Sequence, residues 1–335
     1  MKYVSIVTPC FNEEGNVLAL YEKIRQIFIG LPQYKYEHIF IDNCSTDRTA
    51  DILADIANKD ENIKVIFNVR NFGPGRSGGY ALLQARGDAV IGLACDFQDP
   101  PELIPSFLKM WEDGFKVVFG QKIKSEENKI VFAIRKVYYR IINAISSIDQ
   151  FTNVTGFGLY DKEVVGYLRW MNDPEPYFRA AIAELGYVVG LVQYTQPVRR
   201  TGKSSYNIFR YIDTAIIGIL STSKKPLRIA TYFGFSMSAI SLLLSLLYLI
   251  LKLCNWNSFT LGLAPIIISI FFFSSVQLAF IGLIGEYIGS ILTRVTRRPL
   301  VVERGSINME GNKDLKNGIE KDDSWNVTRR TKSQV

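Results

Sequence analysis

Short apolar blocks and stretches with helical spacing alternate over residues 1–125. Continuous apolar runs of this length are typical of strands buried on both faces of a mostly parallel sheet, with helices connecting them. The pattern therefore predicts an α/β fold. The predicted strands are 4–9, 38–43, 63–69, 89–95 and 117–120.

Polar residues and helix-start signals follow these predicted strands. Asn12 precedes two glutamates and Asp99 precedes two prolines, and such residues are favoured at helix N-termini. Ligands of an open parallel sheet bind beyond the carboxyl ends of its strands. The polar or rigid residues predicted to lie there are Pro9, Asn12, Asp42, Asn71 and Asp96.

The last third of the chain is far more apolar than the rest. No charged residue occurs from Ile229 to Leu251 or from Leu253 to Gly285. Because a bilayer span needs about 20 apolar residues, we predict two transmembrane helices, at about 229–251 and 263–285. Two buried core helices are the alternative, but both runs lack the polar face of an ordinary amphipathic helix.

Basic residues flank the two predicted spans on the same side. They are Lys224, Lys225 and Arg228 before the first span and Arg294, Arg297 and Arg298 after the second, whereas the connecting turn has only Lys252. The positive-inside rule then places both termini in the cytoplasm. The N-terminal residues do not form a signal peptide. We expect a multi-pass membrane protein with both termini in the cytoplasm.

Three regions follow from this pattern. Residues 1–225 form a cytosolic domain that includes two amphipathic helices lying on the membrane surface, at about 129–145 and 208–220. Residues 226–300 form the membrane domain. From 301 to 335 the composition is polar, which predicts a disordered tail.

Composition limits the chemistry. The 335 residues carry a formal net charge of +7, with four widely spaced cysteines and one histidine, so a zinc site and a Ser-His-Asp triad are both disfavoured. His38 is interpreted as structural, and any bound metal must be a hard cation held by oxygen.

Two aspartates at predicted strand ends are candidates for ligand binding. Asp96 either holds a divalent cation that bridges a diphosphate or caps a turn. Asp42 either hydrogen-bonds a nucleotide base or ribose or caps its own turn. The basic, glycine-containing turn from Arg70 to Arg76 could approach a phosphate, although it lacks a G-x-G-x-x-G fingerprint.

Together these segments resemble the family 2 glycosyltransferases, and within them the polyprenyl-phosphate glycosyltransferases, such as dolichyl-phosphate mannose synthase and the bacterial undecaprenyl-phosphate glucosyltransferases of O-antigen modification. The matching segments are Val7 to Glu14, Ile41-Asp42, Ser45 to Thr49, Arg70 to Gly73, Gly87 to Val90 and Asp96 to Glu102. Further matches are Tyr139-Arg140, Leu159, Asp161-Lys162, Gly202, Ser204, Tyr206, Gly285 to Gly289 and Arg297 to Pro299.

The resemblance implies a GT-A fold, a nucleotide-sugar donor, Mg²⁺ or Mn²⁺, and a polyprenyl phosphate acceptor at the bacterial inner (plasma) membrane. We expect no nucleic-acid partner, and the paired surface helices and two spans per chain would suit a homo-oligomer. By position, the donor-binding residues are Pro9, Asn12, Glu14, Asp42, Asn71, Gly73 and Asp96. Asp96 and Gln98 are the implied catalytic residues, with Asp96 as the metal ligand. The implied contacts of the acceptor phosphate are Arg135, Arg140, Arg200 and Ser204.

Three positions depart from the family pattern. Asn43, Ala94 and Gly156 stand where the family usually has aspartate. Loss of a general base would weaken attack by a neutral hydroxyl, because positioned proton transfer contributes roughly 10²–10⁴-fold. A phosphate acceptor is already ionised at pH 7 and needs no base.

The functional hypothesis is therefore inverting transfer of a hexose from a nucleotide-diphosphate sugar to undecaprenyl phosphate or a similar carrier. Two alternatives stay open. One is a glycosyltransferase with a hydroxyl acceptor, for which Glu102, Asp99 or Glu175 would supply the base. The other is a catalytically silent protein that binds the lipid carrier.

Overall fold

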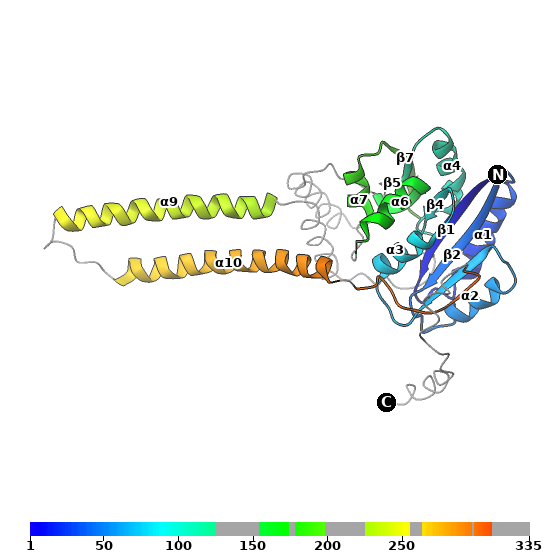
Figure 1. Cartoon of the computed structure of the whole chain (residues 1–335), viewed down its shortest axis with the longest axis horizontal. Coiled ribbons are helices and arrows are strands. Elements are labelled where there is room, and N and C mark those ends of the chain that lie inside the picture. The colour runs from blue at the N-terminus through cyan, green and yellow to red at the C-terminus, as the bar shows by residue number, and fades with distance from the viewer. Residues whose placement is uncertain (125–153, 174–177, 198–224, 255–262, 297, 310–335) are drawn as a thin grey trace, which may run out of the picture.

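The chain consists of a sheet-based domain and two long helices that project from one side of it (Figure 1). A computed structural model describes residues 1–124, 154–173, 178–197, 225–254, 263–296 and 298–309. The strands are β1 (Lys2–Cys10), β2 (Tyr34–Asp42), β3 (Ile63–Asn68), β4 (Ala89–Gly92), β5 (Val117–Lys124), β6 (Val154–Asp161), β7 (Val189–Thr195) and β8 (Glu303–Ile307). The helices are α1 (Val17–Ile29), α2 (Thr49–Ala57), α3 (Pro74–Gln84), the 3-10 turn η1 (Pro101–Leu103), α4 (Ile104–Glu112), α6 (Lys162–Met171), α7 (Phe178–Leu185), α9 (Lys225–Cys254) and α10 (Leu263–Val295).

The eight described strands form one mixed sheet in the order β7-β5-β6-β4-β1-β2-β3-β8. The pairs β1–β2, β1–β4, β2–β3 and β5–β7 are parallel, whereas β6 and β8 run antiparallel to their neighbours. The chain passes from β1 outward to β3 and then returns to place β4 on the other side of β1. This reversal of strand order is where an open α/β sheet forms its ligand crevice.

Helices cover both faces of the sheet. Leu20 of α1, Leu53 of α2 and Phe107 of α4 belong to one buried cluster with the sheet. The other cluster includes Leu82 of α3 and Val164 of α6. Strands buried on both faces need apolar residues at consecutive positions, which explains the continuous apolar runs of β1 to β4 in the sequence.

The α/β prediction and all five predicted strands are confirmed, although β2 begins four residues earlier than expected. The pattern did not reveal β6, in which Gly156 and Gly158 weaken the strand signal. A side chain at Gly158 would clash with the carbonyl oxygen of Val118, so the close approach of β5 and β6 requires glycine there.

The expectation of a disordered tail from residue 301 is wrong at its start. Val301 is buried and residues 303–307 form β8, which pairs antiparallel with β3. The charged residues of this segment suggested a solvated chain, but pairing with the open edge of β3 satisfies its backbone groups. The remainder of the predicted tail, from 310 onward, lies outside the described residues, as do the predicted surface helices at 129–145 and 208–220.

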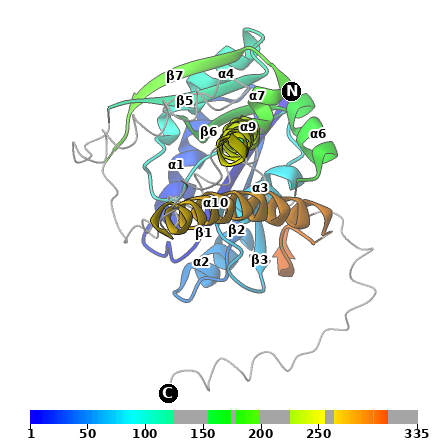
Figure 2. The same ribbon diagram turned by 90° about the vertical axis from the view of Figure 1, so that its left-hand side faces the viewer.

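The two predicted spans correspond to α9 and α10. The two helices approach each other at Phe233 and Phe280, whose ring centres lie 6.1 Å apart. Figure 2 shows both helices on the same side of the domain. Among the described residues, one stretch, Phe272–Val295 in α10, is long and apolar enough to cross a membrane. The prediction of two transmembrane helices is thus not confirmed, and the stretch that qualifies begins later than the predicted 263–285.

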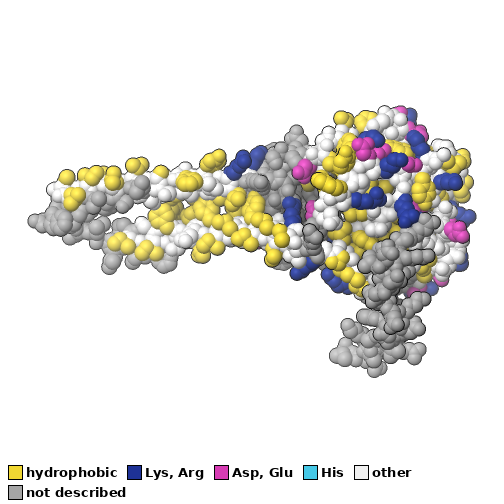
Figure 3. Space-filling view, in the orientation of Figure 1, with side chains coloured by type: hydrophobic (Ala, Val, Ile, Leu, Met, Phe, Trp, Pro, Cys, Tyr) yellow, Lys and Arg dark blue, Asp and Glu magenta, His cyan; other side chains and the backbone are white. Residues whose placement is uncertain are grey.

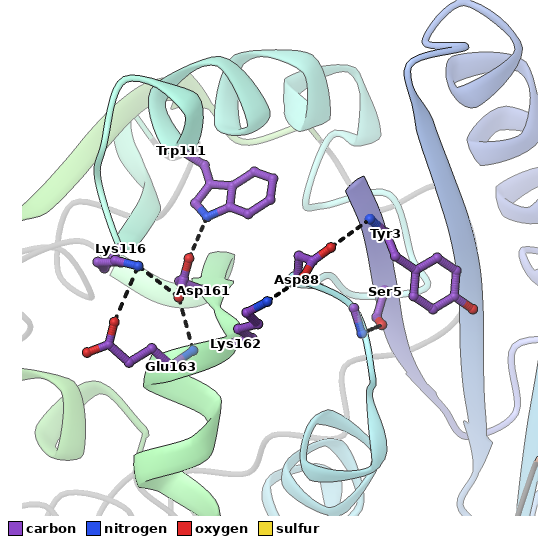
Figure 4. A network of polar contacts seen from close by, with 9 residues as sticks. Tyr3, Ser5, Asp88, Trp111, Lys116, Asp161, Lys162 and Glu163 are labelled. Carbon is purple, nitrogen blue, oxygen red and sulfur yellow. Dashed lines mark hydrogen bonds and ion pairs between the residues drawn. The ribbon is translucent and has the colours of Figure 1, made fainter. Parts of the chain in front are cut away.

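A polar network joins the parallel and antiparallel parts of the sheet at the amino end of β1 (Figure 4). Asp88 accepts hydrogen bonds from Lys162 Nζ at 2.7 Å and from the Tyr3 amide at 3.1 Å, which together hold the pKa of Asp88 below its ordinary value. Asp161 accepts from Trp111 Nε1 at 2.8 Å and caps α6. These residues of the matching motifs therefore stabilise the fold at the end of β1 opposite the ligand crevice.

Candidate active site

Two loops at the carboxyl ends of β1 and β2 are joined by side-chain hydrogen bonds. Asn12, in the left-handed region at φ 56°, donates its backbone N–H to Ser45 Oγ at 3.0 Å. Its Oδ1 accepts from the Thr46 amide at 2.8 Å. Asn12 thus lies at the predicted place, but its side-chain oxygen holds the neighbouring loop.

Glu14 has a similar position between the two loops. Its Oε2 accepts from the Arg48 amide at 3.0 Å, and its own amide donates to Asp47 Oδ2 at 3.2 Å. Pro9 lies at the end of β1 against α3, where a Cβ added at Gly78 would be 3.4 Å from its ring. The predicted residues Pro9, Asn12 and Glu14 therefore lie together at the carboxyl ends of β1 and β2.

Asp42 ends β2 and is almost fully buried, with 1% of its surface exposed. Its two carboxylate oxygens accept from the Ser45 amide at 3.1 and 3.3 Å. Burial raises the pKa of Asp42 above its ordinary value, while the hydrogen bonds from Ser45 and the charge of Arg304 partly oppose this rise. The capping role is present in the fold, and the carboxylate also lies at the ligand end of the sheet.

Asn43 is the centre of a buried amide network that the sequence did not reveal. Its Oδ1 accepts from Ser77 Oγ at 2.7 Å, the Phe72 amide at 2.9 Å and Asn68 Nδ2 at 3.1 Å. Its Nδ2 donates to Asn71 Oδ1 at 2.9 Å. Because an aspartate has no hydrogen to donate to Asn71, this departure from the family pattern has a structural reason.

The loop after β3 is held in place by this network. Asn71 Oδ1 also accepts from the Gly73 amide at 2.8 Å. Gly73 has a φ of 86°, a conformation that favours glycine, and it precedes Pro74 at the start of α3. Arg70 stacks over the Phe72 ring with its Cζ 4.0 Å from the ring centre. The structure therefore brings Asn71 and Gly73 to the same end of the sheet as Asp42.

Asp96 lies four residues beyond β4, across β1 from Asp42, and is 8% exposed. Its Oδ1 accepts from the Gln98 amide at 3.2 Å. Phe97 between them has a φ of 61°, which is costly for a large side chain and occurs most often at functional sites. The strained turn sets the direction of the Asp96 carboxylate.

Asp99 lies behind this turn. Its Oδ2 accepts from the Ala94 amide at 3.1 Å and its Oδ1 accepts from Tyr194 Oη at 3.2 Å. Burial raises the pKa of Asp99, and the nearby charge of Asp96 adds to the rise. Ala94 is the second position that departs from the family pattern, and its backbone N–H holds the Asp99 carboxylate in place. Glu102, another candidate base, forms an ion pair with Lys23 at 2.8 Å, and Glu175 lies outside the described residues.

Gly156, the third departure, has a φ of 99°, and its carbonyl oxygen accepts from Tyr160 Oη at 2.9 Å. A side chain would find open space there but would require a backbone conformation that residues other than glycine rarely adopt. An aspartate at this position would therefore need a change of the local backbone as well as a mutation.

The carboxylates fit a divalent cation that is shared with a substrate. No group of three or more His, Cys, Asp or Glu side chains able to hold a metal occurs in the described part of the chain. Mg²⁺ is commonly bound by one or two carboxylates together with substrate phosphates, and not by a complete protein cage. The Asp96 carboxylate, in the turn after β4 and close to Asp99, suits that arrangement.

Other predicted residues are not placed. Arg135, Arg140, Arg200 and Ser204 lie outside the described residues.

His38 is buried in β2, contacts Thr8 Oγ1 at 2.9 Å and has a pKa lowered to about 3 by burial. Its position in the core supports its interpretation as a structural residue.

A segment far along the sequence also reaches the crevice. Residues 298–309, here called the strap, return from α10 to the sheet and include β8 (Figure 1). The Pro299 carbonyl accepts from Arg76 Nη2 at 2.7 Å, and Glu303 accepts from Tyr80 Oη at 2.7 Å. The sequence pattern did not predict this strand, because the charged residues around it were interpreted as part of a polar tail.

The fold is that of an α/β protein with polar side chains gathered at the carboxyl ends of parallel strands, beside a change in strand order. Open α/β sheets, including those of nucleotide-binding enzymes, bind their ligands at this place. Comparison with known proteins agrees. The profile of "Glycosyl transferase family 2" matches residues 5–168.

Similar proteins cover almost the whole chain. An uncharacterised glycosyltransferase, YkcC, of Bacillus subtilis is 30% identical over 91% of this chain and 94% of its own length. A bactoprenol glucosyl transferase derived from the SfII prophage of Shigella flexneri is 31% identical over 90% of this chain and 98% of its own. A prophage bactoprenol glucosyl transferase homologue of Escherichia coli is 29% identical over 88% and 96%. The chain belongs to glycosyl transferase family 2 and is a glycosyltransferase with a GT-A-like α/β fold.

Proposed function

We propose that this glycosyltransferase moves a hexose, glucose in the first instance, from a nucleoside-diphosphate sugar to a polyprenyl phosphate at the cytoplasmic surface of the membrane. The names of the relatives from Shigella flexneri and Escherichia coli support the acceptor class and the sugar. The observation that carries the proposal is the strap, which joins the carboxyl end of β3 directly to the end of the apolar helix α10.

The nucleoside of the donor would lie over the ends of β1, β2 and β3. Asp42 offers a buried carboxylate that accepts an N–H or hydroxyl group of the ligand, and Asn71 offers its amide N–H groups, because its Oδ1 already accepts from Asn43 and Gly73. The loops held by Asn12 and Glu14 form the rim. The network at Asn43 would keep Asn71 in one orientation and so reduce the entropy lost on binding.

The diphosphate would lie toward Asp96. Departure of a nucleoside diphosphate develops negative charge, which a divalent cation held by Asp96 would neutralise when bound. Asp96 is held by the Gln98 amide and by the turn at Phe97, so its carboxylate is positioned before the ligand arrives. Gln98 would direct its side-chain amide to the same phosphate group.

The missing carboxylate at Gly156 favours a phosphate acceptor over a hydroxyl acceptor. A lipid phosphate is ionised at neutral pH and attacks the anomeric carbon without losing a proton, and a single displacement inverts the configuration there. Of the described candidate bases for a hydroxyl, Asp99 has hydrogen bonds at both oxygens and Glu102 is paired with Lys23. Arg135, Arg140, Arg200 and Ser204 remain the proposed contacts of the acceptor phosphate.

Membrane attachment is proposed through α10 and, as a second span, α9. Apolar side chains cover both helices, and basic side chains gather where the helices meet the domain (Figure 3). Lys225 and Arg228 are exposed at the start of α9, and Arg294 and Arg298 are exposed at and just after the end of α10. Cations at these positions suit the cytoplasmic, anionic surface of a bilayer. Because the start of α9 and the end of α10 would both lie at the cytoplasmic surface, the sugar-transfer site would lie beside the lipid headgroups.

The experiment is sugar transfer by the purified full chain in detergent, with labelled UDP-sugars and GDP-sugars, undecaprenyl phosphate and Mg²⁺ or Mn²⁺. We expect a lipid-linked monosaccharide whose formation falls by at least about 100-fold in Asp96→Asn, since removal of one group that stabilises transition-state charge costs about 10²–10³. The control is Asp113→Asn, the same change at an exposed residue just after the C-terminal end of α4.

Failure of every donor to yield a lipid product, in a preparation that binds undecaprenyl phosphate, would overturn the proposal and favour the silent lipid-binding alternative. Transfer to an added sugar hydroxyl and not to the lipid phosphate would favour the hydroxyl-acceptor alternative.

A further inference from the structure

The strap brings a cation to the donor site. Residues 298–309 follow the apolar helix in sequence, yet the segment is fixed to the domain along its length. The Val69 amide donates to the Val302 carbonyl at 3.0 Å, and Asn308 Nδ2 donates to the carbonyls of Ala57 and Ile63 at 2.7 and 2.9 Å. With the bonds of Pro299 and Glu303, these contacts make the strap a fixed wall of the crevice.

An irregularity in β8 sets the direction of one side chain. Gly305 lies opposite Phe67, whereas Glu303 lies opposite Asn68, so Arg304 is an extra residue in the ladder. Such bulges re-aim side chains beside functional sites. The Arg304 guanidinium lies over the Phe67 ring, with its Cζ 5.7 Å from the ring centre.

Phe67 is also the register partner of Asp42. Adjacent strand residues in register point to the same face of a sheet, so Asp42 and Phe67 share one face, and the Arg304 guanidinium lies over the Phe67 ring. The charge of Arg304 acts on Asp42 and partly offsets the rise in the pKa of that carboxyl caused by burial. A buried acceptor, Asp42, and an exposed planar donor, Arg304, therefore lie at the same end of the sheet, on the two strands that flank β3.

The position of β8 in the sheet indicates which part of the donor Asp42 and Arg304 would contact. Strands are spaced about 4.8 Å apart, so β8, four strands from β4, is about 19 Å from the strand that leads to Asp96. That separation is too large for Arg304 and Asp96 to hold the same phosphate group. The base end of a nucleotide whose diphosphate lies at Asp96 would extend toward Asp42 and β3.

We propose that Arg304 is a donor-binding residue that recognises the nucleotide base, donating to a base carbonyl oxygen next to the N–H that Asp42 accepts. The inference rests on the proposed function for the existence of a nucleotide donor and extends it by assigning a residue from beyond the membrane helices. A guanidinium presents several N–H donors in one plane, so it can hydrogen-bond the edge of a base while it lies over the Phe67 ring. The strap would thereby link donor recognition to the membrane end of the chain.

Nucleotide binding to the full chain in detergent tests this role without a lipid acceptor. The probes are UMP, UDP, GMP and GDP with Mg²⁺, measured by titration calorimetry on the wild type, Arg304→Ala and Arg304→Lys. For the base that binds, we expect Arg304→Ala to weaken the monophosphate and the diphosphate by the same factor, about tenfold or more. Arg304→Lys should retain the charge but bind more weakly than the wild type, because an ammonium lacks the planar donors.

Two controls separate base recognition from other effects. Asp96→Asn should weaken the diphosphate and leave the monophosphate nearly unchanged, whereas Arg25→Ala, which removes an exposed arginine of α1, should change neither. Thermal unfolding of both Arg304 variants should stay within about 2 °C of the wild type, as for an exposed side chain.

Equal affinity of the wild type and both Arg304 variants for the nucleotides would overturn the assignment, even if sugar transfer to the lipid proceeds. A loss confined to the diphosphate would also overturn it, because it would place Arg304 at the phosphates. Conversely, the Arg304→Ala variant could lose tenfold in affinity for both nucleotides although the wild type transfers no sugar to the lipid. That result would support the role of Arg304 in base recognition and would count only against the proposed acceptor.

Discussion

Replacing Asn43 by aspartate tests the buried amide network with a change of almost no volume. The substitution restores the residue usual in the family but removes the hydrogen that Asn43 Nδ2 donates to Asn71 Oδ1 at 2.9 Å. Two oxygens then face each other. Rotation of the Asn71 amide would relieve that contact, but the Gly73 amide, which donates to the same oxygen at 2.8 Å, would lose its acceptor.

Either arrangement loses one hydrogen bond and leaves a polar group without a partner, which costs about 1–3 kcal/mol. The three donors around Oδ1, from Asn68, Phe72 and Ser77, remain in place and stabilise the new charge, so we expect no larger cost even though position 43 is 3% exposed. For a domain of this size each kcal/mol lowers the Tm by about 2–4 °C. The expected decrease in Tm is therefore about 2–12 °C.

The assay is thermal unfolding of the purified full chain in detergent, followed by tryptophan fluorescence. Asn58→Asp, the same chemical change at the exposed end of α2, is the matched control and should shift the Tm by less than about 2 °C. A Tm for Asn43→Asp equal to or above that of the wild type would refute the assignment of a required donor at this position.

Two further predictions concern stability. Burial lowers the pKa of His38 to about 3, well below the value of about 6.5 for an unfolded histidine. Between these two pH values the unfolded state therefore binds more protons than the folded state. The free energy of unfolding should fall by up to about 1.4 kcal/mol per pH unit as the pH drops below 6.5. His38→Gln should flatten that slope in Tm measured from pH 7 to 4.5, and an unchanged slope would show that other groups cause it. Gly156→Ala should lower the free energy of unfolding by about 1–2 kcal/mol, because its φ of 99° disfavours a side chain. Unfolding at the wild-type temperature would mean that the backbone at β6 adjusts without cost.

Much of the fold could be predicted because its signals are local. The apolar runs of β1 to β5 and the polar residues after them depend on neighbours in sequence, and the structure confirms these strands and the positions of Asp42 and Asp96 at the ligand end. Helix starts were less reliable. The signal at Asn12 predicted a helix there, but α1 begins at Val17 because Asn12 adopts a left-handed turn and bonds the next loop.

The candidate site was only partly predictable for the same reason. Asn43 is adjacent to Asp42, but its importance comes from Asn68, Asn71 and Ser77, which only the packing of α3 against the sheet brings to it. In the sequence, Asn43 was recognisable only as a missing carboxylate. The structure shows that it is a donor and acceptor that a carboxylate cannot replace without a loss.

By itself the sequence determined the order of strands and helices along the chain, the apolar character of the last third and the family motifs, since these depend on residue type and local spacing. The tertiary structure decided which distant residues share a site. Arg76 meets Pro299 across 223 positions, and β8 closes the edge of β3 after the long helices. Edge pairing depends on an available row of backbone groups more than on side-chain pattern, so a charged segment that resembles a solvated tail became the edge strand of the sheet.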